Sequence, residues 1–119
     1  MTLCPGCEQE LTLSRLHCAH CGVTYSGQFG QSRLARLPAG MQHLAETVLL
    51  CGGNLKEVAT RQDISYPTLR KRMDSLIVEL RRLKDADDAE TDRLLSAVEE
   101  GSMRPEQAAR RIREMNHGS

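Results

Sequence analysis

Aromatic residues are scarce in this sequence: tryptophan is absent, and Tyr25, Tyr66 and Phe29 make up 3% of the 119 residues. Hydrophobic residues reach only 39%, so little bulky material is present to fill one large core. An excess of charge is also absent, because 16 Lys/Arg balance 16 Asp/Glu. The net charge therefore predicts neither a nucleic-acid partner nor a membrane partner.

Long hydrophobic runs are absent too, and no stretch approaches the roughly 18 apolar residues that span a bilayer. The first residues lack a basic start followed by an apolar stretch, which argues against a secretory leader. We therefore expect a cytoplasmic protein with no membrane partner. A Ser/His/Asp set and a Gly-rich phosphate loop are also missing, so we do not expect an enzyme.

Cysteine, by contrast, is well represented, and four of the five cysteines form two C-x-x-C pairs. In a reducing compartment this spacing favours metal ligation over the alternative of two disulfides or free thiols. Four thiolates complete the tetrahedral shell of a structural zinc site and leave no open position for catalysis. We predict one structural Zn²⁺ per chain, ligated by Cys4, Cys7, Cys18 and Cys21.

Short alternating stretches at residues 11–15 and 23–25 predict two strands beside these pairs. Strands next to cysteine knuckles are the layout of a zinc ribbon, here over residues 1–29. His17 and His20 lie near the second pair, and we expect them to hydrogen-bond near the site or to face solvent. Because the metal supplies ~10 kcal/mol or more of folding free energy in such modules, removing it is expected to unfold this end only.

Residues 30–38 are predicted to be a connector that ends at Pro38. An apolar stripe from Met41 onward predicts a first helix that ends at Cys51-Gly52-Gly53, where glycine suits a left-handed cap. Cys51 itself is expected to be a packing residue.

Two further helices follow this first one. Asn54 is expected to cap a short second helix, with Glu57 completing a capping box. Ser65 is expected to cap a longer third helix that carries Pro67 in its first turn. Three helices joined by brief turns predict a trihelical helix-turn-helix over residues 39–84.

The third helix carries a basic face, since Ser65 to Lys84 holds six Lys/Arg against two acidic residues. In a helix-turn-helix the N-terminal part of this helix enters the major groove. The alternative is a solvated basic face on a bundle helix. We expect groove contacts near the start of the helix and a phosphate contact just beyond, from Ser65, Tyr66, Thr68, Arg70, Lys71 and Arg72.

The rest of the chain is predicted to form a C-terminal helical hairpin over residues 85–119. The acidic run at 85–90 is interpreted as a linker or the first turn of a new helix. Helices at 92–100 and 105–115 then flank Gly101, and residues 117–119 are expected to be disordered. The alternative is a frayed acidic tail. Leu80 and Leu83 extend beyond the reach of the two short helices, so we expect them to contact a second copy of the chain or the hairpin.

The helix-turn-helix segment resembles that of the factor-for-inversion-stimulation class and of enhancer-binding activators. The resemblance rests on Gly53-Asn54-Leu55-Lys56-Glu57-Val58-Ala59 and on Ile64-Ser65-Tyr66-Pro67-Thr68-Leu69, with Asp63 in place of the usual turn glycine. It implies that Ser65, Tyr66, Thr68, Arg70 and Lys71 fall where the class touches DNA.

The order of motifs, from Cys4 to Leu83, is similar to that of a bacterial family of regulators that pair a zinc ribbon with a helix-turn-helix. The C-terminal run resembles a hairpin that serves other regulators in oligomerisation or protein docking. We therefore expect a mostly α protein with a small β zinc ribbon. Its expected function is that of a sequence-specific, DNA-binding transcriptional regulator acting as a homodimer through Leu80, Leu83 and the hairpin. The alternative is an adaptor whose ribbon docks on RNA polymerase or another regulatory partner, which the neutral net charge favours.

Overall fold

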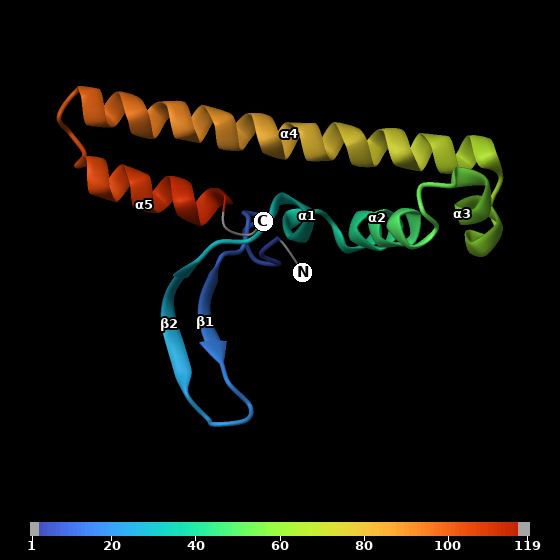
Figure 1. The fold of residues 1–119 in the computed structure, drawn as a ribbon, viewed down its shortest axis with the longest axis horizontal. Helices are drawn as coiled ribbons and strands as arrows, with labels where there is room; N and C mark the ends of the chain where they lie inside the picture. The colour runs from blue at the N-terminus through green and yellow to red at the C-terminus, as the bar shows by residue number, and fades with distance from the viewer. Residues whose placement is uncertain (1–2, 117–119) are drawn as a thin grey trace.

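The computed structural model describes residues 3–116 and is mostly helical, with one small antiparallel sheet (Figure 1). The predicted fold class, mostly α with a small β ribbon, is confirmed. The expected disorder at residues 117–119 lies outside the described residues. In chain order the elements are β1 Leu13–His17, β2 Thr24–Phe29, α1 Arg33–Arg36, α2 Ala39–Leu50, α3 Leu55–Gln62, α4 Tyr66–Glu99 and α5 Pro105–Asn116.

Helix α4, with 34 residues, is the longest element and extends along the whole molecule. Helices α3, α2, α1 and α5 lie along one side of it (Figure 1). The radius of gyration is 18.1 Å, whereas a compact domain of this length has about 13.5 Å. The fold is elongated because successive parts of α4 are covered by different short elements, so there is no single central core.

The acidic run at residues 85–90 lies in the middle of α4, so its interpretation as a linker or a new helix start is wrong. Residues 92–100 likewise form no separate helix, since they continue the same one. No glycine or proline occurs between residues 68 and 100, and these are the residues that end a helix. Exposed ion pairs one turn apart add modest support, among them Lys84 with Asp88 and Arg93 with Glu90. Gly101, with φ +78°, follows the end of the helix.

The apolar core of the trihelical unit joins α2, α3 and the first half of α4. Its buried members come from all three helices, which explains why they assemble as one unit although each is short. Cys51 is one of them, as expected for a packing residue. The cluster consists of Leu44, Cys51, Val58, Ala59, Leu69 and Leu76.

The caps of α3 and α4 form as predicted. The Asn54 side chain accepts hydrogen bonds from the backbone N–H groups of Lys56 and Glu57, and the Ser65 hydroxyl accepts one from Thr68. The capping box is only half formed, because Glu57 pairs with Arg61 and the Asn54 N–H bonds to the Cys51 carbonyl.

The turn between α3 and α4 requires a left-handed residue. Asp63 adopts φ 54° and ψ 48° there, a conformation that glycine takes most easily and Asp or Asn tolerates. This geometry explains why related turns carry glycine at this position and why Asp63 can replace it.

The apolar stripe of α4 beyond the helix-turn-helix is covered by the chain itself. Leu83 is only 4% exposed and lies one turn before Asp87, which pairs with Arg33 and Arg36 of α1. The expectation that Leu83 awaits a second copy is therefore wrong. Leu80 is half-buried, and Leu94 on α4 and Ala108 on α5 are buried where these helices form the C-terminal hairpin.

Candidate nucleic-acid interface and metal centre

All six residues predicted to touch DNA are exposed at the beginning of α4. The first of them, Ser65, is oriented by its cap: its hydroxyl lies 2.8 Å from the Thr68 hydroxyl and accepts from the Thr68 N–H. The helix therefore begins with two ordered hydroxyl groups and a free aromatic ring, Tyr66, beside them. Helices α2 and α3 pack on the apolar side of α4, through Leu69 and Leu76, and leave all six side chains exposed.

The basic residues of this surface do not all share one face. Arg70 and Arg72 are two positions apart, which places them about 200° apart around the helix. Arg70 forms a 3.7 Å ion pair with Asp74, whereas Arg72 lies beside residues of α2 and α3. One duplex groove can therefore receive Arg70 directly, while Arg72 is placed on the flank.

The carboxylate of Asp74 is part of the same surface. Both partners of the Arg70 pair are about half or more exposed, and such pairs are worth at most ~1 kcal/mol. Arg70 can therefore exchange this partner for a base or a phosphate at small cost.

Each cysteine pair forms a knuckle whose backbone favours thiolate. In the first knuckle the Gly6 N–H donates to the Cys4 sulfur at 3.3 Å. Hydrogen bonds from the Gly6 and Cys7 backbone, and from Cys7 itself, lower the pKa of the Cys4 thiol. In the second knuckle Cys21 does the same for Cys18 and lowers its pKa, with help from the His20 backbone. The soft donors and the N–H groups aimed at sulfur both fit zinc ligation.

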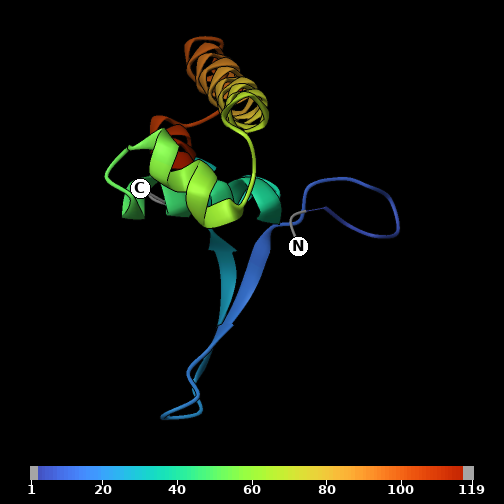
Figure 2. The same ribbon diagram turned by 90° about the vertical axis from the view of Figure 1, so that its right-hand side faces the viewer.

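The two knuckles occupy different parts of the ribbon. The loop of the first lies beside the base of the β1–β2 hairpin, and the turn of the second lies at its tip (Figure 2). Within residues 3–116, no three or more His, Cys, Asp or Glu side chains gather where one ion could bind them. His17 hydrogen-bonds to the Thr24 hydroxyl at 3.0 Å. The convergence of four thiolates on one ion thus stays a prediction.

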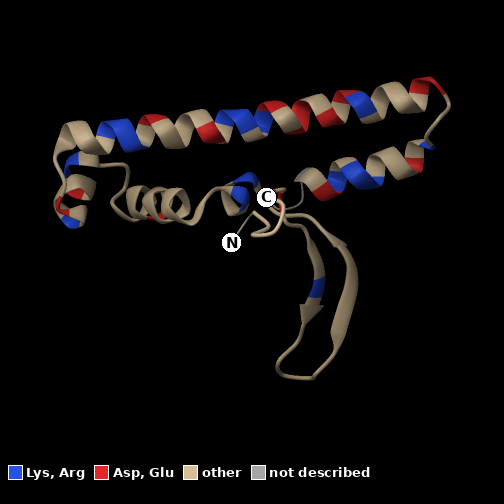
Figure 3. Cartoon of the chain, turned by 180° about the vertical axis from the view of Figure 1, so that it is seen from behind, with Lys and Arg blue, Asp and Glu red and all other residues tan. Residues whose placement is uncertain are grey.

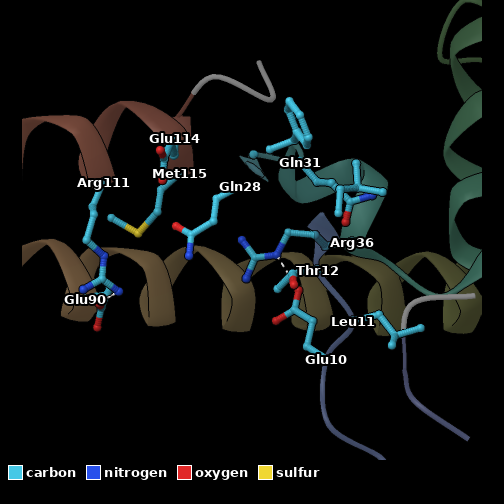
Figure 4. Close-up of a pocket in the computed structure, with 13 residues that line it drawn as sticks. Glu10, Leu11, Thr12, Gln28, Gln31, Arg36, Glu90, Arg111, Glu114 and Met115 are labelled. Atoms are coloured by element: carbon cyan, nitrogen blue, oxygen red, sulfur yellow. Dashed lines mark hydrogen bonds and ion pairs between the residues drawn. The ribbon is translucent and has the colours of Figure 1, made fainter. Parts of the chain in front are cut away.

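A cluster of ion pairs around the buried Asp87 joins the ribbon end of the chain to α4, and the sequence analysis did not predict it. Asp87 of α4 is 7% exposed and accepts hydrogen bonds from Arg33 at 3.0 Å and from Arg36 at 2.9 Å. Arg36 also pairs with Glu10 at 2.7 Å (Figure 4). Burial would lower the pKa of Arg36, but the hydrogen bonds that Arg36 donates to the Glu10 and Asp87 carboxylates outweigh it and raise that pKa.

The signal for this cluster was present in the sequence. Asp87 falls four residues after Leu83 on the inward stripe of α4, and a charge at an inward position needs a partner. The one-turn helix α1 within the segment predicted as a connector supplies two arginines. That segment therefore fixes the position of the ribbon, and it is more than a spacer.

Replacing Asp87 by alanine is expected to destabilise the chain by about 3 kcal/mol, because two arginines lose their shared carboxylate in a mostly buried place. Urea unfolding monitored by circular dichroism measures the loss. Asp88→Ala is the matched control, since Asp88 is exposed and, among residues 3–116, pairs only with Lys84, and it is expected to change stability by less than ~1 kcal/mol. Equal effects of the two substitutions would contradict the role of the cluster.

A hollow of about 340 Å³ lies between the ribbon, α4 and the end of α5 (Figure 4). Both of its cations are paired, Arg36 with Glu10 and Arg111 with Glu90. At its edge, a Cβ on Gly30 would collide with the Glu114 carbonyl. The close approach of α5 to the ribbon thus requires glycine at this position. We interpret the hollow as part of the packing contact between α5, α4 and the ribbon.

The fold and site together define a zinc-ribbon protein with a helix-turn-helix. Residues 4–35 match the family model described as "DUF2089 zinc ribbon", and residues 37–82 match "Domain of unknown function (DUF2089)-HTH". The chain belongs to this family, whose ribbon implies zinc binding and whose helix-turn-helix points to DNA binding. No curated protein and no solved structure matches the chain. Within residues 3–116, no helix has the length and apolar character needed to cross a membrane.

Proposed function

We propose that the protein is a sequence-specific, DNA-binding transcriptional regulator that acts in the cytoplasm. The observation that carries this proposal is the capped start of α4, where the side chains of Tyr66, Thr68, Arg70 and Lys71 are all exposed. Arginine and lysine recognise guanine edges and phosphates, and hydroxyl groups reach bases or phosphates. The overall neutral charge is no obstacle, because the acidic residues that balance it concentrate after residue 84, away from this surface (Figure 3).

Binding to DNA is expected to depend steeply on salt. If Arg70, Lys71 and Arg72 of two copies neutralise about six phosphates, the logarithm of the affinity falls with the logarithm of salt with a slope of about −5. A gel shift on duplexes selected from a random library, repeated across a salt series, measures this slope. A flat response without sequence preference would favour the adaptor function instead.

In this proposal the zinc ion is structural and is held by Cys4, Cys7, Cys18 and Cys21. The donor set supports it, since all four are thiols and Cys4 and Cys18 have lowered pKa values. The metal would supply the anchor that the β1–β2 hairpin otherwise lacks. Every residue of β1 is exposed, and an isolated two-stranded hairpin is at best marginally stable in water.

A homodimer is part of the proposal, because one short recognition surface needs a second half-site for affinity and sequence specificity. With Leu83 buried, the surface that best fits a second copy is the outer face of α1 and α2. Leu49 and Leu50 there are 74% and 71% exposed, and with Leu34 they border a shared groove. Helix α2 carries a single charged residue, Glu46 (Figure 3), so two copies can meet through this face with little like-charge repulsion.

The double substitution Leu49→Glu with Leu50→Glu is expected to convert a dimer to a monomer of 13.3 kDa, because four carboxylates would then meet across the two-fold axis. Light scattering on a sizing column measures the mass. Leu95→Glu, at an exposed leucine of α4, is the control that should remain dimeric. A wild-type chain that is monomeric at every concentration would remove the dimer from the proposal.

The second candidate function, an adaptor, is favoured by the surface of the ribbon. Leu16 and Tyr25 are paired across the two strands, lie on the same face, and are both exposed. Together they form an exposed apolar surface on which a protein partner could dock. This candidate and DNA binding use different surfaces, so a regulator could carry both.

A further inference from the structure

A cavity of about 690 Å³ lies where the beginning of α2, the end of α3 and the first half of α4 meet. Its volume falls within the range of small-molecule sites, about 300 to 1,000 Å³. Its lining includes the apolar residues Pro38, Met41 and Leu44. It also includes the polar residues His43, Arg61 and Arg72. The cavity therefore combines apolar surface with hydrogen-bond donors.

The charges of the lining are of one sign, because no carboxylate is among the residues that line the cavity. The Arg61 guanidinium forms an ion pair with the Glu57 carboxylate at 3.1 Å. Arg72 makes no side-chain hydrogen bond or ion pair with any residue between 3 and 116. A guanidinium without a protein partner beside apolar side chains can bind a carboxylate, sulfonate or phosphate.

We propose that this cavity binds a small organic anion, with its apolar body against Met41 and Leu44 and its anionic group on Arg72. Three helices of the trihelical unit contribute, so the ligand would contact α2, α3 and the DNA-reading helix at once. This inference goes beyond DNA binding, because it gives Arg72, which the proposed function places on a DNA phosphate, a small-molecule partner in the cavity.

The test uses the full-length, zinc-loaded chain and the fluorescent probe anilinonaphthalene sulfonate, which has apolar rings and one anionic group. We expect saturable binding of one probe per chain at this cavity. The neutral analogue N-phenyl-1-naphthylamine has the same rings without the sulfonate. It is expected to bind about tenfold more weakly, because it forms no charge-assisted hydrogen bond with Arg72.

Two variants place the site. Arg72→Gln removes the anion partner and is expected to weaken the probe about tenfold. Gly40→Leu is expected to block the cavity, since Gly40 lines it and a Cβ added there meets nothing within 4 Å. Arg81→Gln is the matched control, because Arg81 is exposed on the same helix, about 180° around it from Arg72.

Each outcome decides the proposal. Loss of the sulfonate preference in Arg72→Gln, with normal binding in Arg81→Gln, supports it. Equal affinity for the neutral analogue, or probe binding unchanged in both Arg72→Gln and Gly40→Leu, overturns it. A DNA-binding measurement on the same variant tests the other source of an anion, the DNA backbone. If Arg72→Gln weakens DNA binding while the probe shows no saturable site, Arg72 binds a DNA phosphate and the small-molecule site is rejected.

Discussion

The double variant Arg70→Ala with Lys71→Ala is expected to lower the affinity for a selected DNA site by at least about 100-fold. Each lost base or phosphate contact costs about 1 to 3 kcal/mol, and a dimer loses the contacts of both copies. The fold should persist, because both side chains are exposed and alanine is a good helix former. A gel shift at constant salt measures the affinity, and circular dichroism measures the helix content.

A control with the same loss of charge separates recognition from general attraction. Arg81→Ala with Arg82→Ala removes two exposed cations more than two turns further along α4, and it is expected to weaken binding far less. Equal losses in the two double variants would show that α4 attracts DNA only through its charge. Unchanged binding in Arg70→Ala with Lys71→Ala would remove the central claim about the start of α4.

Loss of the metal is expected to have the largest effect on folding, and it should be confined to the ribbon. Cys18→Ser should lower the zinc content from one per chain to nearly none, since a three-thiolate remainder binds far more weakly. Because structural zinc supplies ~10 kcal/mol or more in small modules, the hairpin should lose its hydrogen-exchange protection. The helices should keep theirs, because the core around Leu44, Leu69 and Leu76 contains no part of the ribbon.

Cys51→Ser is the matched control, because Cys51 is buried in the core of the trihelical unit. It should keep its zinc and instead destabilise the helices by about 1 to 3 kcal/mol, the cost of a buried hydroxyl without a partner. The two variants therefore differ in both measurements. Cys18→Ser loses zinc and the exchange protection of the hairpin, whereas Cys51→Ser keeps its zinc and loses stability in the helices. If Cys18→Ser retained a full equivalent of zinc, the four-cysteine site would be wrong.

Local chemistry made much of the fold predictable. Asn54 and Ser65 were identified as caps because their side chains bond to backbone groups two or three residues away, an interaction that sequence spacing fixes by itself. The position of Asp63 in the turn and the glycine break at Gly101 are local in the same sense. The strands were located with errors of a few residues, as is usual at element ends.

The prediction failed where position depended on partners far away in sequence. The sequence predicts a linker or a new helix start at the acidic run because its four acidic residues and two alanines carry no apolar stripe of their own, yet α4 passes through it. Asp87 is buried there because Arg33 and Arg36, more than fifty residues earlier, fold against it. Leu83 was assigned to a dimer contact for the same reason, since nothing near it in sequence covers it.

The sequence by itself determined the cysteine pairs, the caps, the turn and the basic start of the third helix, because each depends on residues within one or two turns of each other. Only the tertiary structure decided that α4 is one continuous helix and that α1 attaches the ribbon to it. It also decided that Arg72 faces a cavity while Arg70 faces solvent. These features arise from long-range burial and charge pairing, whose free energy exists only once distant segments have come together.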